Sequence, residues 1–383
     1  MTTSVSLSEI NRAMAAIRIT PESVIREAND VPRKIWHGIS ALANFSEEEL
    51  AIATTPKQEI YRDDMMRLYR YLPTVEHDLG IPVLIVYALV GRYQMIDLEQ
   101  DRSFVRKLLD AGLTVYMVDW GLPTRAQRWT NIDDYVSGYL DDCVDVIREH
   151  EGVDTINLLG ICQGGVFSTC YAALFPDKLR TLTLAITPLD FHGDAGCPQP
   201  GTAYMNLWAR GLTGEDIDRY IDAHGNVAGD SVGLSFLLMD PVANVGKYTV
   251  DLLSILDDDR KLLNFLHMER WLADRPSTPG EVARQWVKDL YQDNKLVKNE
   301  LVLGGRTVDL RNITMPVLNV YAEGDVVVPN STTRGVGPRL GTSDYTELGV
   351  PGGHIGTFVG GKAQRVLGPG IIDWLKARNG AQQ

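Results

Sequence analysis

Residues 155–175 read TINLLGICQGGVFSTCYAALF, and this stretch decides the fold. It begins with an apolar run of strand length, Thr155–Leu159, and it ends with small and apolar residues at helical spacing. Between the two lies GICQG, with Cys162 at its centre and a glycine two positions away on either side. Larger side chains at those glycines would collide with the strand or the helix of so sharp a turn. The stretch therefore predicts a strand that turns abruptly into a helix, with Cys162 at the turn.

A nucleophile at such a turn is the elbow of the α/β-hydrolase fold, which is most often written G-x-S-x-G. Here cysteine stands in the place of serine. The N-terminus of the following helix would favour both a thiolate and a developing oxyanion. The alternative is a buried, inert cysteine in a glycine-rich turn. The strand before Cys162 and the helix after it favour the nucleophile.

The remainder of the chain alternates between short apolar runs and amphipathic segments, which predicts an α/β fold with a mostly parallel sheet covered on both faces. Residues 60–72 are expected to form an edge hairpin. We expect strands at 82–88, 114–119, 155–159, 181–186, 316–322 and 345–349, and helices at 98–111, 132–150 and 362–376.

This alternation suggests a division into four parts. Residues 1–55 are expected to form an N-terminal arm of short helices, and 56–191 the first part of the hydrolase core. Residues 192–305 contain no convincing core strand and predict a helical cap or lid inserted over the active site, and 306–383 complete the core. The cap is expected to have helices at 216–223, 252–273 and 281–291, and its aromatic residues Trp208, Phe236, Trp271 and Trp286 could pack a core or shape an acyl pocket.

Charge and composition exclude several classes of protein. The net charge of −13 argues against a general nucleic-acid binder. The longest apolar run, 81–90, is too short to span a bilayer, and the first 20 residues lack the order of a signal peptide. The four cysteines show no metal-ligand spacing and are typical of reduced thiols, so we expect a cytoplasmic protein with no metal or cofactor. Cys143, Cys170 and Cys197 are then most simply structural.

In this fold the acid and the histidine follow the nucleophile in that order along the chain. Asp325 comes just after the predicted strand 316–322, and His354 just after 345–349. We therefore predict that His354 is the general base for Cys162 and that Asp325 orients its imidazole. The histidines at 37, 77, 150, 192, 224 and 267 lack this position. Rival acids remain in Glu323, Asp119 and Asp190.

The oxyanion hole is expected to use two backbone N–H groups. One belongs to Gln163, the residue after the nucleophile, and the other to the loop after the strand 82–88, where Val90 is our candidate.

A cysteine at the elbow also bears on the type of reaction. Because one thioester replaces another at little thermodynamic cost, Cys162 favours acyl transfer from a thioester over simple hydrolysis.

Several segments together resemble a known family. They are LGICQGG (159–165), TPKQEIYRDDMMRLYRY (55–71), VYMVDWG (115–121), DDYVSGY (133–139), TPLDF (187–191), RQWVKDLYQDNKL (284–296) and PGGHIG (351–356). Over about residues 50–378 the chain resembles the short polyhydroxyalkanoate synthases, most nearly the class III catalytic subunit, in which a cysteine replaces the serine of a lipase-like box.

The resemblance implies polymerisation of 3-hydroxyacyl-CoA, most often 3-hydroxybutyryl-CoA, into a polyester with release of CoA. Cys162 would carry the acyl group or the growing chain and His354 would activate it, while Asp325 would assist His354 or activate the incoming 3-hydroxyl. The resemblance also implies homodimers at the surface of polymer granules and a second, non-catalytic helical subunit of the PhaE type.

The chain departs from the family in two places. The loop 87–95 reads YALVGRYQM, where the family pattern has Asn before the arginine and Pro after it, and the first 50 residues resemble no known segment.

Two alternative functions remain open at this stage. One is a thioesterase or polyester depolymerase of the same fold, since the three predicted catalytic residues do not decide the acceptor. The other is a catalytically silent binding protein.

Overall fold

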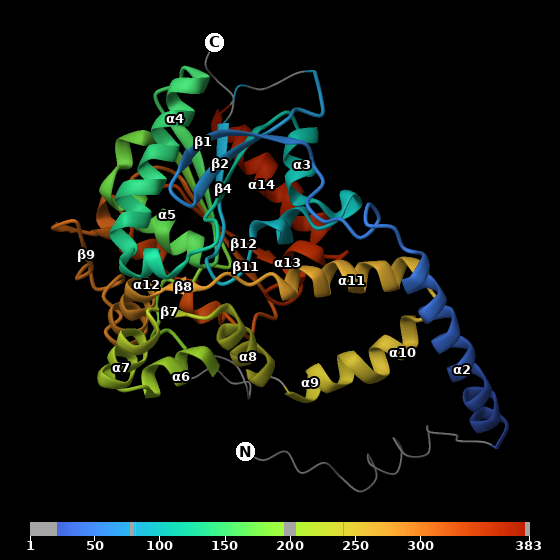
Figure 1. The fold of residues 1–383 in the computed structure, drawn as a ribbon. Coiled ribbons are helices and arrows are strands. Elements are labelled where there is room, and N and C mark those ends of the chain that lie inside the picture. Colours follow the sequence, from blue (N-terminus) through green and yellow to red (C-terminus); the bar gives the residue numbers. More distant parts are fainter. Residues whose placement is uncertain (1–20, 77–79, 81, 195–203, 240, 380–383) are drawn as a thin grey trace, which may run out of the picture. The chain divides into compact units, whose positions relative to one another are not determined.

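The computed structural model describes residues 21–76, 80, 82–194, 204–239 and 241–379, and its main sheet has eight strands (Figure 1). Its strand order is β1-β2-β4-β3-β5-β6-β11-β12. The strands are β1 (Lys57–Asp63), β2 (Met66–Tyr71), β3 (Pro82–Val86), β4 (Thr114–Asp119), β5 (Ile156–Ile161), β6 (Leu179–Ala185), β11 (Val317–Ala322) and β12 (Tyr345–Val350). The β1–β2 hairpin joins β4 antiparallel, and all other neighbours run parallel. The predicted α/β-hydrolase fold is confirmed.

Both faces of the sheet are covered, as its apolar strands require. In β3, every residue is buried, and alternate side chains enter opposite cores, Leu84 and Val86 on one face and Val83 and Ile85 on the other. One face is covered by α4 (Asp141–Glu151) and α5 (Gln163–Leu174), the other by α3 (Phe104–Asp110) and α14 (Gln364–Asn379) (Figure 1).

All three predicted core helices differ from their predicted bounds, and the one expected at 362–376 is α14, which runs from Gln364 to Asn379. The 3-10 turn η1 (Tyr93–Asp97) precedes the segment 98–111, and a second 3-10 turn, η2 (Gln100–Arg102), lies within it. The helix α3 starts only at Phe104 because the side chain of Ser103 caps it, accepting a hydrogen bond from the Arg106 N–H. The segment 132–150 is π-helical over η4 (Asp134–Leu140) before α4. Short helical turns η3 (Arg125–Trp129), η5 (Pro176–Lys178), η8 (Leu310–Asn312), η9 (Asn330–Thr332) and η10 (Gly337–Arg339) and helix α13 (Gly356–Val359) complete the core.

Between β6 and β11, the described residues are mainly helical and add no strand to the main sheet. The helices are α6 (Tyr204–Gly211), α7 (Gly214–His224), α8 (Gly229–Met239), α9 (Pro241–Gly246), η6 (Lys247–Asp251), α10 (Leu252–Ile255), α11 (Asp259–Ala273), α12 (Gly280–Gln285) and η7 (Trp286–Gln292). Two small antiparallel pairs accompany them, β7 (Asn226–Val227) with β8 (Thr278–Pro279) and β9 (Val302–Leu303) with β10 (Arg306–Thr307).

The chain divides into two compact units. The larger contains Ala51–Pro241 and His267–Gln383, and the smaller joins the residues up to Leu50 to Val242–Leu266. In the smaller unit, α2 (Pro21–Asn44) is a single helix of 24 residues, where we expected short helices. It contributes Ala41 to a small apolar cluster of that unit. The units thus group part of the predicted cap with the N-terminal arm, and the four-part division stays a prediction.

Candidate active site

Cys162 lies between β5 and α5 in a strained backbone conformation. Its φ of 53° and ψ of −120° fall where non-glycine residues are rare, at a cost of about 1–3 kcal/mol. The surrounding sheet holds the turn in place, since the Cys162 N–H donates to the carbonyl oxygen of Ala185 on β6 at 2.9 Å. The thiol group is thereby presented at the C-terminal end of the parallel strands, where α/β folds place their chemistry.

The glycines of the elbow are required by close packing. A Cβ atom at Gly164 would lie 2.1 Å from the carbonyl oxygen of Val86, and one at Gly165 would lie 1.9 Å from Oγ1 of Thr187. At Gly160 a Cβ atom would lie 2.5 Å from Cα of Gly165. The helix α5 therefore approaches β3 and β5 more closely than any side chain permits, which is the reason for the glycine spacing on which the prediction rests.

Asp325 and His354 follow adjacent strands, β11 and β12, and their side chains meet. Nδ1 of His354 lies 2.7 Å from Oδ2 of Asp325, and the two side chains are 11% and 1% exposed. The loops that carry them also contact each other, because the Gly324 N–H donates to the carbonyl oxygen of Gly352 at 2.9 Å. The parallel β11–β12 pair thus brings together two residues that are 29 positions apart in sequence.

The Asp325 carboxylate is fixed by further hydrogen bonds. Its Oδ1 accepts from the N–H groups of Val327 and Val328, both at 2.9 Å. The rival acids are placed differently: Asp119 binds Arg92 and Asp190 accepts from Asn294, while the Glu323 residue is exposed. Of the four acids that we considered, the structure pairs Asp325 with His354.

The charge state of His354 follows from its surroundings. Burial lowers the pKa of His354, but the Asp325 carboxylate and then Cys162, through charge and hydrogen bonding, outweigh it and raise that pKa to about 10. This shift favours the protonated form of the imidazole ring. With Nδ1 on Asp325, the other ring nitrogen is left for Cys162. The structure thus brings all three predicted side chains together.

The two predicted oxyanion donors also lie close together, in an arrangement that the sequence did not predict. The Val90 N–H donates to Oε1 of the Gln163 side chain at 3.1 Å, and the Leu89 N–H donates to the same oxygen, also at 3.1 Å. The Gln163 side chain is buried and binds the loop that follows β3 to the start of α5. The oxyanion assignment itself stays a prediction, and in this structure the Val90 N–H is engaged by the Gln163 side chain.

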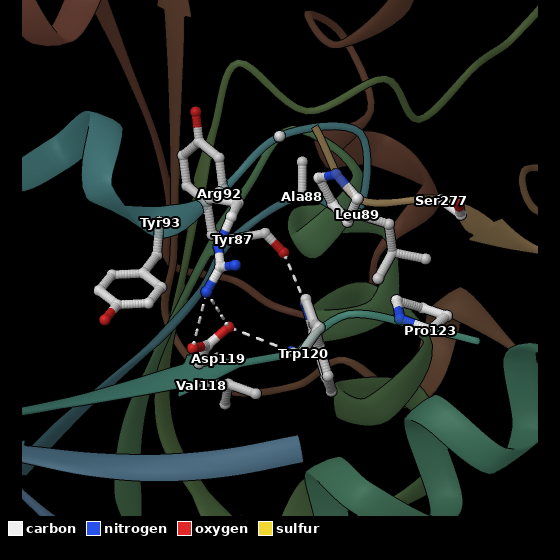
Figure 2. Close-up of a pocket in the computed structure, with 13 residues that line it drawn as sticks. Tyr87, Ala88, Leu89, Arg92, Tyr93, Val118, Asp119, Trp120, Pro123 and Ser277 are labelled. Atoms are coloured by element: carbon white, nitrogen blue, oxygen red, sulfur yellow. Dashed lines mark hydrogen bonds and ion pairs between the residues drawn. The ribbon is translucent and has the colours of Figure 1, made fainter. Parts of the chain in front are cut away.

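A small pocket borders the same loop (Figure 2). Figure 2 shows Arg92 directed at Asp119, whose Oδ2 lies 3.1 Å from Nη2, and the Trp120 indole N–H donates to the carbonyl oxygen of Tyr87 at 2.9 Å. The pocket is lined by residues 87–89, 91–93, 118–121, 123, 276 and 277, which include none of the three predicted catalytic residues.

Two tyrosines near the nucleophile were missed by sequence reasoning. Burial raises the pKa of Tyr87 and of Tyr291, and the charge of Cys162 raises both further. Both phenols therefore interact electrostatically with Cys162. A tyrosine has no spacing signature of its own, so only the resemblance of 284–296 to a family segment drew attention to the neighbourhood of Tyr291.

The remaining cysteines and cap aromatics are mostly structural. Cys143 and Cys170 are free thiols in the core, and burial raises the pKa of both. Cys197 lies outside the described residues. Trp286 packs edge-to-face against Phe167 and Phe191 with ring centroids 5.9 Å apart in both pairs. Trp208, in contrast, is 45% exposed.

Comparisons with known proteins agree on fold and family. The family model described as the alpha/beta hydrolase fold matches residues 81–360. A second family model, described as the N-terminus of poly-beta-hydroxybutyrate polymerase (PhaC), matches residues 43–108. The crystal structure of a candidate lipase from Sulfolobus solfataricus superposes with a TM-score of 0.53, covering 84% of this chain and 93% of that one. At 14% identity this likeness shows the fold alone.

Much closer relatives are found among curated proteins. The poly(3-hydroxyalkanoate) polymerase subunit PhaC of Synechocystis sp. is 46% identical over 93% of this chain and 94% of its own length. The protein of the same name from Allochromatium vinosum is 42% identical over 95% of this chain and 100% of its own. Among the described residues, no helix combines the length and apolarity needed to cross a membrane.

Proposed function

This chain belongs to the family of PhaC subunits of poly(3-hydroxyalkanoate) polymerases, and we propose that it polymerises 3-hydroxyacyl-CoA, most often 3-hydroxybutyryl-CoA, into polyhydroxyalkanoate with release of CoA. The observation that carries the proposal is the arrangement of the site. A cysteine occupies the strained elbow, and a histidine bound to Asp325 at 2.7 Å stands next to it.

The first step is acylation of Cys162. Its thiolate attacks the thioester carbonyl of the substrate, and the negative charge that develops on the carbonyl oxygen is stabilised by backbone N–H groups. The bond between the acyl carbon and the CoA sulfur then breaks, and the departing sulfur takes the proton of His354. The products are free CoA and an acyl thioester on Cys162, so one thioester bond replaces another.

The second step is elongation. The 3-hydroxyl oxygen of another acyl-CoA attacks the thioester on Cys162, an oxoester bond forms, and the Cys162 thiolate is released. The hydroxyl proton passes to His354 or to Asp325. The lengthened chain, which still carries CoA, returns to a cysteine thiolate with release of that CoA. The ester bond is more stable than the thioester, which drives the cycle forward.

The proposal extends to the assembly and its place in the cell. We assign the chain to homodimers, together with a non-catalytic helical subunit of the PhaE type, at the surface of polymer granules in the cytoplasm. The partner subunit is supported by the names of the relatives from Synechocystis sp. and Allochromatium vinosum, which are themselves called subunits. The proposed chemistry uses no cofactor other than the CoA carried by the substrate.

The test uses the purified full chain and 3-hydroxybutyryl-CoA, with and without a candidate partner subunit, and follows free thiol and acyl product together. The proposal predicts CoA release accompanied by turbidity and insoluble polyester, faster in the presence of the partner. Cys162→Ala is the control and should release no CoA above background. CoA release with only free 3-hydroxybutyrate would instead identify a thioesterase. No release in either condition would contradict an enzymatic function with this acyl donor.

A further inference from the structure

The loop between β3 and η1 carries the predicted oxyanion donor Val90, and it is held at three places. At its start, the carbonyl oxygen of Tyr87 accepts the Trp120 indole N–H at 2.9 Å. In its middle, the N–H groups of Leu89 and Val90 donate to the side chain of Gln163. These contacts come from the core of the hydrolase fold, from the end of β4 and the start of α5.

The third contact comes from the helical insertion. The indole N–H of Trp271, in the C-terminal half of α11, donates to the carbonyl oxygen of Arg92 at 2.8 Å. The same ring lies against Gly91, where a Cβ atom would be only 2.9 Å from Cζ2 of the indole. Trp271 is 7% exposed, so its ring is almost wholly packed. The glycine that departs from the family pattern at position 91 is thus the residue that admits this ring.

The residue after Gly91 is also tied to both elements. Nη2 of Arg92 lies 3.1 Å from Oδ2 of Asp119 at the end of β4. Nη1 lies 3.6 Å from Oδ2 of Asp274, just after α11. The loop from Leu89 to Arg92 is therefore bound by the core on one side and by the end of α11 on the other.

We propose that Trp271 is a positioning residue: it holds the loop whose Leu89 and Val90 N–H groups bind the Gln163 side chain, and it thereby fixes Gln163, whose own backbone N–H is a predicted oxyanion donor. The proposal rests on the proposed function. An oxyanion donor contributes about 10²–10³-fold to the rate, and a displacement of about 1 Å costs about 10²-fold. A contact that fixes the two residues directly after Val90 therefore acts on catalysis without touching substrate.

The first test replaces Trp271 by Phe, which keeps a packed ring but removes the N–H. Since a hydrogen bond contributes about 0.5–1.5 kcal/mol, we expect acylation of Cys162 to slow by up to about tenfold. Acylation is measured as the burst of p-nitrophenolate from p-nitrophenyl butyrate, a step that needs the thiolate and the oxyanion donors but no polymerisation. In the same variant, alkylation of Cys162 by iodoacetamide should keep its rate, because this reaction forms no oxyanion.

Trp374→Phe is the matched control. Trp374 is also 7% exposed, and its indole N–H donates to Oγ1 of Thr346 at 3.3 Å, in the α14 layer. This variant should keep both rates. An undiminished acylation rate in Trp271→Phe, or equal losses of acylation and alkylation, would overturn the proposal. If the wild-type protein gives the p-nitrophenolate burst but forms no polymer from 3-hydroxybutyryl-CoA, the proposed function alone is contradicted. If the wild-type protein gives no burst, both the proposed function and the role of Trp271 are contradicted.

A second variant pair tests the contact with Gly91. Gly91→Ala places a methyl group against the indole ring, so it should slow acylation. In a Trp271→Phe background the smaller ring leaves room for the methyl group, so Gly91→Ala should reduce the acylation rate by a smaller factor. Non-additive effects of this sign are expected only for residues in contact. If Gly91→Ala reduces the acylation rate by the same factor in both backgrounds, the Trp271 ring does not set the position of the loop.

Discussion

Nδ1 of His354 lies 2.7 Å from Oδ2 of Asp325, across the C-terminal ends of two adjacent parallel strands. The carboxylate is almost completely buried and accepts two further backbone hydrogen bonds through its other oxygen. A carboxylate held in this way fixes the orientation of the imidazole ring and stabilises its protonated form. The proposed reactivity of Cys162 depends on this pair.

Removal of the Asp325 charge should therefore slow the reaction strongly. We expect Asp325→Asn to reduce the rate of CoA release from 3-hydroxybutyryl-CoA by about 10²–10⁴-fold, because His354 loses both its orientation and the charge that favours its protonated form. Glu323→Gln is the matched control, since this rival acid lies two residues away on the same loop and is exposed. A comparable loss in the Glu323 variant would show that the acid has been misassigned.

The raised pKa of His354 predicts a pH-dependent stability. Because the folded-state pKa of about 10 is above the usual value of 6.5, this group stabilises the fold fully below about pH 6.5, and its contribution is lost as the pH rises toward the folded value. Cys162→Ala removes the thiol from the comparison. The free energy of unfolding of Cys162→Ala should exceed that of the double variant Cys162→Ala/Asp325→Asn, and this difference should be larger at about pH 6 than at strongly alkaline pH.

Urea unfolding at several pH values measures this difference, and the NMR titration of the His354 ring provides an independent check. In the wild-type protein the imidazolium should persist above neutral pH, and Asp325→Asn should lower its midpoint. A difference that increases with pH, or a His354 midpoint that does not change in the variant, would contradict the assigned charge state.

The packing of the elbow predicts a large effect of a single methyl group. Gly164→Ala would place a Cβ atom 2.1 Å from the carbonyl oxygen of Val86, which belongs to the central sheet and cannot move freely. We expect a loss of about 3 kcal/mol or more in the free energy of unfolding. The gain of about 1 kcal/mol that alanine brings to a helix cannot offset it.

Gly138→Ala is the control for this substitution. Gly138 lies in η4, and a Cβ atom there would have no neighbour within 4 Å. Chemical denaturation should show little change for this variant. If Gly164→Ala unfolds at the wild-type urea concentration, α5 does not approach β3 as closely as the structure shows.

The nature of the nucleophile can be tested by a conservative replacement. Cys162→Ser keeps the shape of the side chain, but the alkoxide is far harder to form with the same base. We expect CoA release to fall by about 100-fold or more, while the free energy of unfolding stays close to that of the wild type. Steady-state kinetics measures the first quantity. An undiminished rate would show that thiol chemistry is not what the reaction requires.

Much of the core could be predicted from the sequence, because its signals are local. The strand 114–119 was predicted with the bounds of β4, since a continuous apolar run of that length has few alternatives. The residues Cys162, Asp325 and His354 each follow a predicted strand, and parallel strands place their C-terminal ends at the same edge of the sheet. Their meeting in space follows from the order of the strands.

The contacts around the oxyanion loop could not be predicted in this way. The bond between Trp271 and Arg92 joins positions 179 residues apart, and no pattern in the sequence links the two. The bond between Gln163 and Val90 depends on a side-chain rotamer, which no periodicity reveals. One signal was available, the glycine at position 91 where the family pattern has Asn. Its explanation required the position of the Trp271 ring.

The most direct test of the account is to identify the covalent intermediate. The protein is mixed with 3-hydroxybutyryl-CoA and quenched in acid within the first turnover, and mass spectrometry of its peptides is combined with measurement of free CoA. We predict a 3-hydroxybutyryl group on Cys162 in the same molar amount as the CoA released. CoA release with an unmodified Cys162, or an acyl group on another residue, would contradict the central claim.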